Sequence, residues 1–355
     1  MKKNIAFFAK NLDIGGIERA IINYVNNIDY SKYNVTLFLE KKEGIYLSEI
    51  NKNININNFN INENKNIIIR KFINALKLIK FSIKYNNRFD FAANFATSLK
   101  SGAILSKRFS KNNAIWFHGN YWNTKEEAQK FLKYVRAKKY RKIVFVSESL
   151  KDKYLSVYNS NQLLYVINNP VNYNEMLRKG NEIIKEKKTK TLILNVGRHE
   201  EKSKNLIMLL NSVKKLLDAN YDFELWMVGS GPDTDLYKAK VKDLNIEKNV
   251  KFLGKKSNVY PYFKICDASV LSSYEEGNPV VYLESKIFNK PIISTDVSDS
   301  KIELKGYGII TDINEESFIK GLKKFLDEGY KIKSKFDPEK YNNDVFNKLY
   351  QVIED

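Results

Sequence analysis

The chain has 355 residues, enough for two ordinary domains, and 43% of them are hydrophobic, so packed cores are expected. Its one cysteine, Cys266, excludes a disulfide within the chain and is typical of a cytoplasmic protein. The formal net charge of +19 comes mostly from residues 1–170, which hold 29 Lys and Arg against 12 Asp and Glu, so the first half is expected to meet an anionic membrane or polyanion.

Strand-like and helix-like segments alternate along this first half. Residues 5–9 predict a strand, Gly15 and Gly16 a loop, residues 17–27 a helix and residues 33–39 a second strand. This order indicates a βαβ unit with a parallel sheet. Gly16 lets the backbone approach a ligand closely at the helix start. Further strand-like runs cover residues 89–95, 114–117, 143–146 and 163–167.

Residues 70–84 predict a basic amphipathic helix. Its apolar residues at helical spacing are Phe72, Ile73, Leu76, Ile79 and Ile83, and Lys77, Lys80 and Lys84 lie among them. We expect the apolar residues to pack on a sheet, as in an ordinary surface helix, and the lysines to reach anionic lipid headgroups. A second basic run spans residues 130–142, and nucleic acid is the competing partner for both. The Asn-rich residues 51–66 are interpreted as a solvated strand and loop.

His118 directly follows the strand-like residues 114–117. In an open α/β sheet, ligands bind at the carboxyl ends of the strands, where His118 is expected to lie. A lone histidine is more often structural than catalytic, so position alone does not assign it a role. His199, next to Arg198, is the rival candidate.

The polar residues 172–190 are expected to end the first domain, after which the alternation restarts. In the second half, the predicted strands are residues 191–196, 223–228, 250–254, 268–272 and 290–294. The predicted helices are residues 206–217, 236–244, 317–327 and 341–353. The sequence therefore predicts an α/β protein with two Rossmann-like domains, residues 1–172 and 173–337. The last helix, about 338–355, is expected to pack back on the first domain.

Basic residues follow the first strand of the second half. An arginine fork and a lysine point charge on one loop can clamp a diphosphate from two directions. Arg198 supplies the fork, and Lys204, just before the helix at residue 206, fits the helix register best, with Lys202 as the alternative. Asp233 and Asp235 lie at a helix start, where acids need no metal to explain them, so no metal site is expected.

Residues 273–284 connect an apolar strand to a helix. Gly277 permits a tight loop, and Pro279 suits the first turn of a helix. The unpaired backbone N–H groups and the positive end of the helix dipole suit a phosphate. Glu276 and Glu284 bracket this position, and carboxylates accept hydrogen bonds from pairs of hydroxyls. The pattern predicts a ligand with a sugar on each side of its phosphates, the shape of a nucleotide-sugar.

These residues resemble the retaining GT-B glycosyltransferases of the group 1 (family 4) type, and residues 295–300 resemble their capsule and exopolysaccharide branch. The resemblance covers nearly the whole chain and is most specific over residues 197–296. It implies two Rossmann-like domains with parallel sheets facing across a cleft. It also implies transfer of a sugar from a nucleotide-sugar, foremost a UDP-sugar, to a glycan or lipid-linked acceptor with retention of anomeric configuration. Asn278, Ser285 and Phe288-Asn289 depart from the family pattern and leave the donor sugar open.

The resemblance also assigns roles. It implies that Arg198 and Lys204 neutralise the diphosphate, that Glu284 holds the ribose and that Glu276 holds donor-sugar hydroxyls. Gly16 and His118 are implied at the reacting face. His118, Glu276, Arg198 and Lys204 are the expected catalytic residues. The expected donor site is Gly16, Arg198, Lys204, Gly229, Gly254, Glu276, Gly277, Asn278, Pro279, Val280 and Glu284, with no cofactor and no metal.

The expected partners are a nucleotide-sugar, a glycan or polyprenyl-linked acceptor, and an anionic membrane surface that contacts the basic first half. The expected location is cytoplasmic and peripheral at the inner face of the membrane, with no bound nucleic acid. Two alternatives stay open. A nucleic-acid-binding protein would explain the charge but not the paired glutamates, and a nucleotide-sugar hydrolase or epimerase of the same fold would share the site. Base, sugar, linkage, acceptor and oligomeric state do not follow from these residues.

Overall fold

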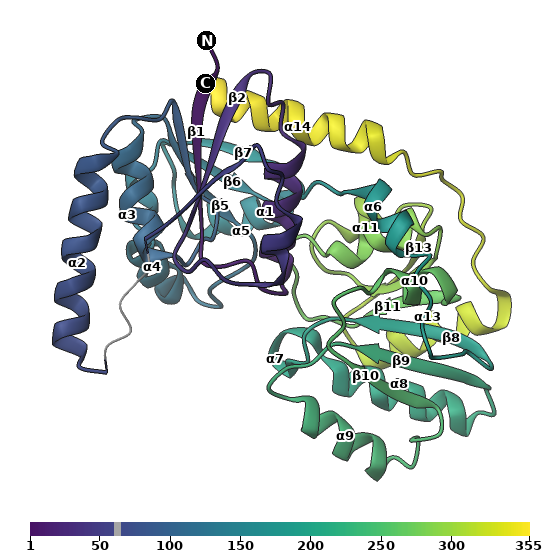
Figure 1. The fold of residues 1–355 in the computed structure, drawn as a ribbon. Coiled ribbons are helices and arrows are strands. Elements are labelled where there is room, and N and C mark those ends of the chain that lie inside the picture. The colour runs from purple at the N-terminus through teal and green to yellow at the C-terminus, as the bar shows by residue number, and fades with distance from the viewer. Residues whose placement is uncertain (60–64) are drawn as a thin grey trace. The chain divides into compact units, whose positions relative to one another are not determined.

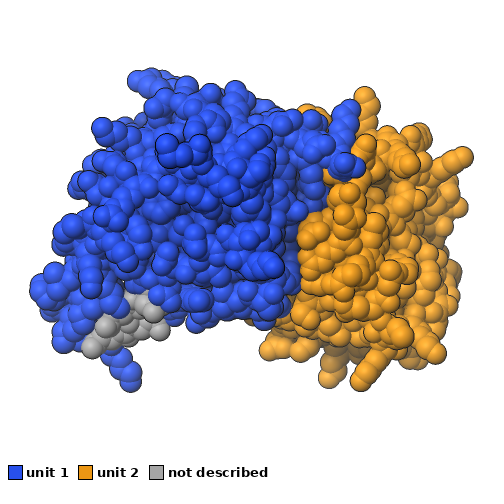
Figure 2. Space-filling view, turned by 45° about the horizontal axis from the view of Figure 1, so that its top comes forward, with its two compact units in different colours: residues 1–171, 339–355 blue, residues 172–338 orange. Residues whose placement is uncertain are grey.

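The computed structural model describes residues 1–59 and 65–355, which form two compact units. The first unit contains residues 1–171 and 339–355, and the second contains residues 172–338 (Figure 2). The division after Val171 lies one residue from the boundary predicted after residue 172. Part of the Asn-rich run, residues 60–64, lies outside the described residues, whereas residues 55–58 of that run form the strand β3.

The first unit has a seven-stranded parallel sheet in the order β3-β2-β1-β4-β5-β6-β7 (Figure 1). Its strands are β1 (Lys3–Ala9), β2 (Tyr33–Leu39), β3 (Asn55–Asn58), β4 (Phe91–Asn94), β5 (Asn113–Phe117), β6 (Lys142–Phe145) and β7 (Leu163–Val166). Its helices are α1 (Gly16–Asn27), α2 (Ile67–Lys84), α3 (Lys100–Phe109), α4 (Lys125–Tyr134), α5 (Glu148–Val157) and the 3-10 turns η1 (Ile45–Glu49) and η2 (Ala137–Lys139).

The order in which the strands are added to this sheet reverses at β1. The chain passes from β1 outward to β2 and β3 and then returns to β4 on the other side of β1. Residues 5–9 of β1 are all buried, as expected for a central strand covered on both faces. The carboxyl ends of β1 and β4 therefore form the topological switch point, the usual place for a ligand in such a sheet.

The last helix, α14 (Pro338–Glu354), packs on the first unit. It buries Val345, Phe346, Leu349, Val352 and Ile353 in that unit's core. The backbone N–H of Asp29 donates to the hydroxyl of Tyr350 at 3.0 Å, and Lys142 donates to the carbonyl of Val352 at 2.6 Å. Residues at the two ends of the chain thus share one core.

The packing expected for residues 70–84 is wrong. They do form a helix, α2, but of the predicted apolar residues only Ile73 is half-buried, whereas Phe72, Leu76, Ile79 and Ile83 are exposed. The helix packs through its opposite side, where Leu78 and Phe81 contact an apolar cluster with Phe38, Phe59 and Phe109 among its members. Figure 1 shows α2 beside α3 at the outside of the unit. The sequence pattern shows two apolar faces, and only one of them meets the protein.

The second unit has a six-stranded parallel sheet in the order β10-β9-β8-β11-β12-β13 (Figure 1). Its strands are β8 (Thr191–Val196), β9 (Phe223–Val228), β10 (Val250–Gly254), β11 (Ala268–Leu271), β12 (Ile292–Thr295) and β13 (Gly308–Thr311). Its helices are α6 (Tyr173–Lys179), α7 (Glu201–Lys204), α8 (Leu206–Asp218), α9 (Thr234–Asp243), α10 (Tyr260–Ile265), α11 (Val280–Ile287), α12 (Ser300–Glu303) and α13 (Glu315–Glu328). The switch point of this sheet lies between β8 and β11.

Helix α11 is the central helix of the second unit. Six consecutive residues, from Val281 to Lys286, are buried, so the helix is enclosed on all sides rather than on one face. The hydroxyls of Ser269 and Ser285 pair at 2.6 Å and join β11 to α11. Pro279 is the residue before the helix, not within its first turn, with φ −64°. Its fixed φ still orients the chain for the helix start.

Candidate active site

A small recess lies at the switch point of the second sheet. Its lining residues come from the ends of β8 and β11 and from the segment that follows β8. They are Asn195, Val196, Gly197, Arg198, Lys204, Leu206, Leu271, Ser272 and Ser273. Two basic residues predicted from the sequence, Arg198 and Lys204, are thus brought to one recess.

Lys204 pairs with Glu276 in this recess. Its Nζ lies 2.5 Å from Oε1 of Glu276, and the hydroxyl of Ser273 donates to the same oxygen at 2.7 Å. The two charged side chains are only 22% and 14% exposed. A cation at the end of α7 and a carboxylate of the loop before α11 are therefore held together where solvent screens them weakly.

Arg198 and Lys202 are placed differently. The side chain of Arg198 is 66% exposed at the mouth of the recess, with one guanidinium nitrogen 3.5 Å from Glu200. Lys202 is exposed and does not line the recess, whereas Lys204 does. The geometry therefore favours Lys204 over Lys202 as the partner of Arg198 at a bound anion.

Hydroxyl groups hold the loop between β11 and α11. Ser272 donates to the carbonyl of Lys204 at 2.9 Å, Thr295 to that of Ser273 at 2.7 Å, and Ser298 to that of Gly277 at 2.5 Å. The loop carrying Glu276, Gly277, Asn278 and Pro279 is thus fixed to the segments after β8 and β12. Sequence reasoning missed these positions, although a serine or threonine at each strand end is a readable signal.

Glu284 lies about one turn into α11, counted from Val280 at 3.6 residues per turn. It is 8% exposed, so its carboxylate is nearly enclosed. A carboxylate can accept hydrogen bonds from a pair of ribose hydroxyls. The position is compatible with the role that the sequence predicts for it.

Asn195, a polar residue in the apolar strand β8, is not among the site residues predicted from the sequence. It is 3% exposed, and its amide donates to the carbonyl of Val270 at 3.2 Å. Among the described residues, its Oδ1 has no hydrogen-bond partner, although it lines the recess. A buried acceptor without a partner is costly, so it is a further polar group available to a ligand.

Gly229 lies where the loops after β8 and β9 touch. Its φ is +148°, and a side-chain Cβ there would lie 1.8 Å from the carbonyl oxygen of Gly197. Only glycine fits this contact. Gly254, with φ +69°, accepts a hydrogen bond from the Gly229 N–H at 2.9 Å. Both glycines shape the backbone beside the recess without contributing a side chain.

His199 is fully buried in this loop region. Its Nδ1 lies 3.1 Å from the hydroxyl of Thr234, and its backbone N–H donates to Ser230. Burial, and then the charge of Lys238, lower the pKa of His199. It joins two loops and does not line the recess.

Asp233 and Asp235, the two aspartates at the start of α9 (Thr234–Asp243), have separate partners. Asp233 accepts a hydrogen bond from the backbone N–H of Glu201 at 2.7 Å, and Asp235 has a 95% exposed side chain, 3.3 Å from Lys238. Within residues 1–59 and 65–355, no three His, Cys, Asp or Glu side chains are grouped to hold a metal ion. Metal independence of the reaction stays a prediction.

His118 lies near the switch point of the first sheet. Its ring packs against Phe95, which follows β4, with centroids 4.5 Å apart, and its Nε2 is 3.0 Å from the Phe95 carbonyl. Since a carbonyl only accepts, Nε2 carries the proton. Burial lowers the pKa of His118 to about 3, opposed by this hydrogen bond. A neutral ring with Nδ1 as an acceptor suits a ligand hydroxyl better than a phosphate.

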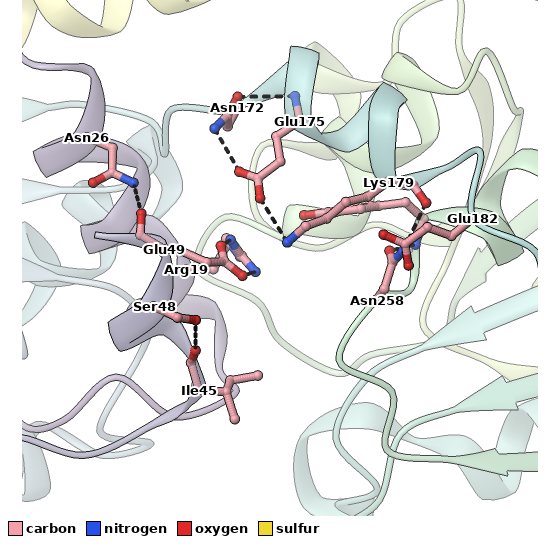
Figure 3. A network of polar contacts seen from close by, with 11 residues as sticks. Arg19, Asn26, Ile45, Ser48, Glu49, Asn172, Glu175, Lys179, Glu182 and Asn258 are labelled. Atoms are coloured by element: carbon pink, nitrogen blue, oxygen red, sulfur yellow. Dashed lines mark hydrogen bonds and ion pairs between the residues drawn. The ribbon is translucent and has the colours of Figure 1, made fainter. Parts of the chain in front are cut away.

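The loop of Gly15 and Gly16 in the first unit is held by residues that follow it closely in the chain. A Cβ on Gly15 would collide with the carboxylate of Glu18, whereas one on Gly16 would meet nothing within 4 Å. A guanidinium nitrogen of Arg19 lies 2.5 Å from Oε2 of Glu49 (Figure 3). The guanidinium carbon lies 3.9 Å from the ring centroid of Tyr46, so both contacts tie α1 to η1. Gly16 therefore presents open space at the start of α1, at the carboxyl end of β1.

Two parallel-sheet Rossmann-like domains define the class of this protein: it has the GT-B fold. The crystal structure of Anabaena HepE in complex with UDP and glucose superposes with a TM-score of 0.77 at 15% identity, over 98% of this chain and 99% of HepE. The predicted fold class is confirmed.

The sequence comparisons point to the same class. Residues 178–343 match the family described as glycosyl transferases group 1. An uncharacterized glycosyltransferase of Haemophilus influenzae is 27% identical over 90% of this chain and 89% of its own length. A Campylobacter jejuni α-1,4-N-acetyl-D-galactosaminyltransferase, whose name gives a diphospho-undecaprenol-linked glycan as acceptor, is 24% identical over 99% of this chain and 94% of its own. The chain is a glycosyltransferase.

Proposed function

We propose that this chain transfers a sugar from a UDP-sugar to a glycan or polyprenyl-linked acceptor, with retention of anomeric configuration, during synthesis of a capsule or another cell-surface glycan. The observation that carries the proposal is the recess at the switch point of the second sheet, where Arg198, Lys204 and the loop of Glu276 meet. The UDP in the HepE structure and the lipid-linked acceptor in the Campylobacter enzyme's name support the choice of donor and acceptor.

We assign the phosphates to the basic side of this recess. Arg198 and Lys204 neutralise the diphosphate as charge develops on it, and the backbone of Gly277 to Val280 at the start of α11 assists. Glu284 accepts the ribose hydroxyls and Glu276 the hydroxyls of the donor sugar. Gly229 and Gly254 shape the nucleotide side. In the first unit, Gly16 and His118 are assigned to the sugar that is transferred.

Retention follows from a front-face displacement in this proposal. The bond from the anomeric carbon to the diphosphate oxygen breaks, and the bond to the acceptor oxygen forms on the same face. The acceptor proton passes to the departing phosphate oxygen, so no protein base is needed. Glu276 is already paired with Lys204 and Ser273, which makes it a poor covalent nucleophile.

The location we propose is the cytoplasmic face of the membrane, with an anionic surface and not nucleic acid as the partner of the basic half. Among the described residues, no helix is long and apolar enough to cross a bilayer.

The test is calorimetry of UDP, GDP and ADP with the parent, Glu284→Ala and the control Glu247→Ala, which removes an exposed carboxylate far along the chain from the recess. UDP is expected to bind without added metal, and Glu284→Ala to weaken it about ten- to hundredfold, since hydrogen bonds to a charged group are lost. Binding of none of the three would overturn the proposal, and nucleic acid retained at moderate salt would support the rival.

Product analysis separates transfer from the two alternatives of the same fold. With an α-linked UDP-sugar and an acceptor, NMR of the product is expected to show an α-linkage. Free sugar or an epimer formed without acceptor would identify a hydrolase or an epimerase instead.

A further inference from the structure

Helix α2 has an exposed apolar stripe. Ile68, Ile69, Phe72, Leu76, Ile79 and Ile83 are between 46% and 79% exposed. At 3.6 residues per turn they fall within an arc of about 100° on one side of the helix. No residue of α2, all of which the structure describes, is buried. An exposed apolar stripe of this length on one helix marks an interaction surface rather than a scatter of surface residues.

The stripe lies opposite the side that holds the helix to the protein. Leu78 and Phe81, on the far side of the helix, contact the apolar cluster of the first unit. Asn66 caps the helix start by accepting from the backbone N–H groups of Ile68 and Ile69. The helix is therefore formed and anchored without the stripe, which remains available to a partner.

The charges of α2 identify the partner. The helix contains five basic residues and no acidic one: Arg70, Lys71, Lys77, Lys80 and Lys84. Lys71 and Lys80 lie beside the stripe on either edge, and both are exposed. A second copy of this chain would bring like charges together, and nucleic acid would leave the six apolar side chains in water. An anionic bilayer accommodates both the basic and the apolar side chains, with the lysines at the headgroups and the apolar side chains below them.

We propose that α2 lies in the plane of an anionic membrane with this stripe inserted below the lipid headgroups. This deepens the proposed function, on which it rests only for placing a lipid-linked acceptor at the same surface. The sequence pattern assigned the lysines alone to lipid, so the membrane contact is now apolar as well as electrostatic. The two contributions respond differently to salt, because screening weakens only the charges.

The first experiment measures binding to vesicles of phosphatidylcholine and phosphatidylglycerol in equal parts. Phe72→Ser/Ile79→Ser is expected to raise the dissociation constant about tenfold or more with an unchanged salt dependence. Lys80→Gln/Lys84→Gln is expected to weaken binding and flatten the salt dependence. The control, Leu236→Ser/Ile302→Ser, removes two exposed apolar residues of the second unit and is expected to change nothing. Equal binding by Phe72→Ser/Ile79→Ser and the parent overturns the proposal.

Depth is read from a tryptophan in the stripe. The three native tryptophans, Trp116, Trp122 and Trp226, are at most 6% exposed and give a constant background. Phe72→Trp is expected to shift its emission to the blue with vesicles and to be quenched by lipids brominated on the acyl chain. Absence of that quenching overturns insertion.

Two further measurements separate other outcomes. Sedimentation without lipid is expected to give the same mass for parent and Phe72→Ser/Ile79→Ser; a parent dimer that this variant dissociates would make the stripe a self-interface and overturn the proposal. UDP calorimetry on the variant is expected to match the parent. Vesicle binding without UDP binding would leave the membrane proposal standing and overturn the proposed function. UDP binding without vesicle binding would overturn the membrane proposal and leave the proposed function standing.

Discussion

Nζ of Lys204 lies 2.5 Å from Oε1 of Glu276. The cation that we assign to the diphosphate is thus already paired with the carboxylate that we assign to the sugar. Both side chains are largely shielded, so the pair interacts more strongly than an exposed ion pair does. A diphosphate that reaches this recess must share Lys204 with Glu276.

Glu276→Gln is therefore expected to change the affinity for UDP and the rate of sugar transfer in opposite directions. UDP should bind about three- to tenfold tighter, because a negative charge beside the phosphates is removed, and the gain should shrink at high salt. Transfer should slow about a hundredfold or more, since the sugar hydroxyls lose a charged acceptor. Calorimetry and initial rates check both, with Glu275→Gln as the control of equal charge. Unchanged or weaker UDP binding would contradict competition for Lys204.

Lys204→Ala and Lys202→Ala form a matched pair on one short helix, α7. The first is expected to lower kcat/KM about a hundred- to thousandfold, because a cation next to the leaving group is lost. The second is expected to stay within about twofold of the parent, because Lys202 is exposed and does not line the recess. Steady-state kinetics decide, with thermal unfolding to show that both variants are folded. A larger loss of kcat/KM for Lys202→Ala than for Lys204→Ala would assign the diphosphate to Lys202 instead of Lys204.

Much of the fold is readable from the chain because a parallel sheet needs continuous apolar strands. Residues 33–39, 191–196 and 223–228 are strands with the predicted bounds. Strand order is not readable, since neighbours such as β1 and β4 are far apart in the chain. The recess depends on that order, because only the placing of β8 beside β11 brings Lys204 to Glu276.

Helix α2 shows why local pattern fails for packing. Phe72 and Phe81 are both apolar, and spacing alone cannot decide which of them faces the protein. The aromatic cluster around Phe38 and Phe109 decides it in favour of Phe81. The identity of the covering partner on the other side is a property of the environment, which no periodicity encodes.

Gly229→Ala is expected to destabilise the second unit more than Gly254→Ala. At Gly229 the backbone has φ +148° and a Cβ would meet the Gly197 carbonyl, whereas Gly254 at +69° has open space around it. The expected losses of unfolding free energy are about 3 kcal/mol and about 1 kcal/mol. Urea unfolding with an unchanged m-value checks this difference. Equal losses would show that the contact with Gly197 relaxes easily.

The histidines predict a pH dependence of stability with a definite sign. The pKa of His118 is lowered to about 3 by burial, and that of His199 is lowered too, so between about pH 3 and 6.5 the unfolded chain binds more protons than the folded one. The contribution of the two neutral histidines to the free energy of unfolding is fully present above about pH 6.5. It is lost as the pH falls, by up to about 1.4 kcal/mol per pH unit for each histidine.

His118→Gln isolates one of these contributions, because the amide can still donate to the Phe95 carbonyl but does not titrate. Between pH 7 and pH 5 the parent is expected to lose about 2 kcal/mol more unfolding free energy than the variant. Denaturant unfolding at the two pH values measures this difference, in which the titration of the carboxylates cancels because both proteins share it. Parallel losses would mean that His118 takes up a proton in the folded state, and a charged ring there could not act as the neutral acceptor that we assign to the transferred sugar.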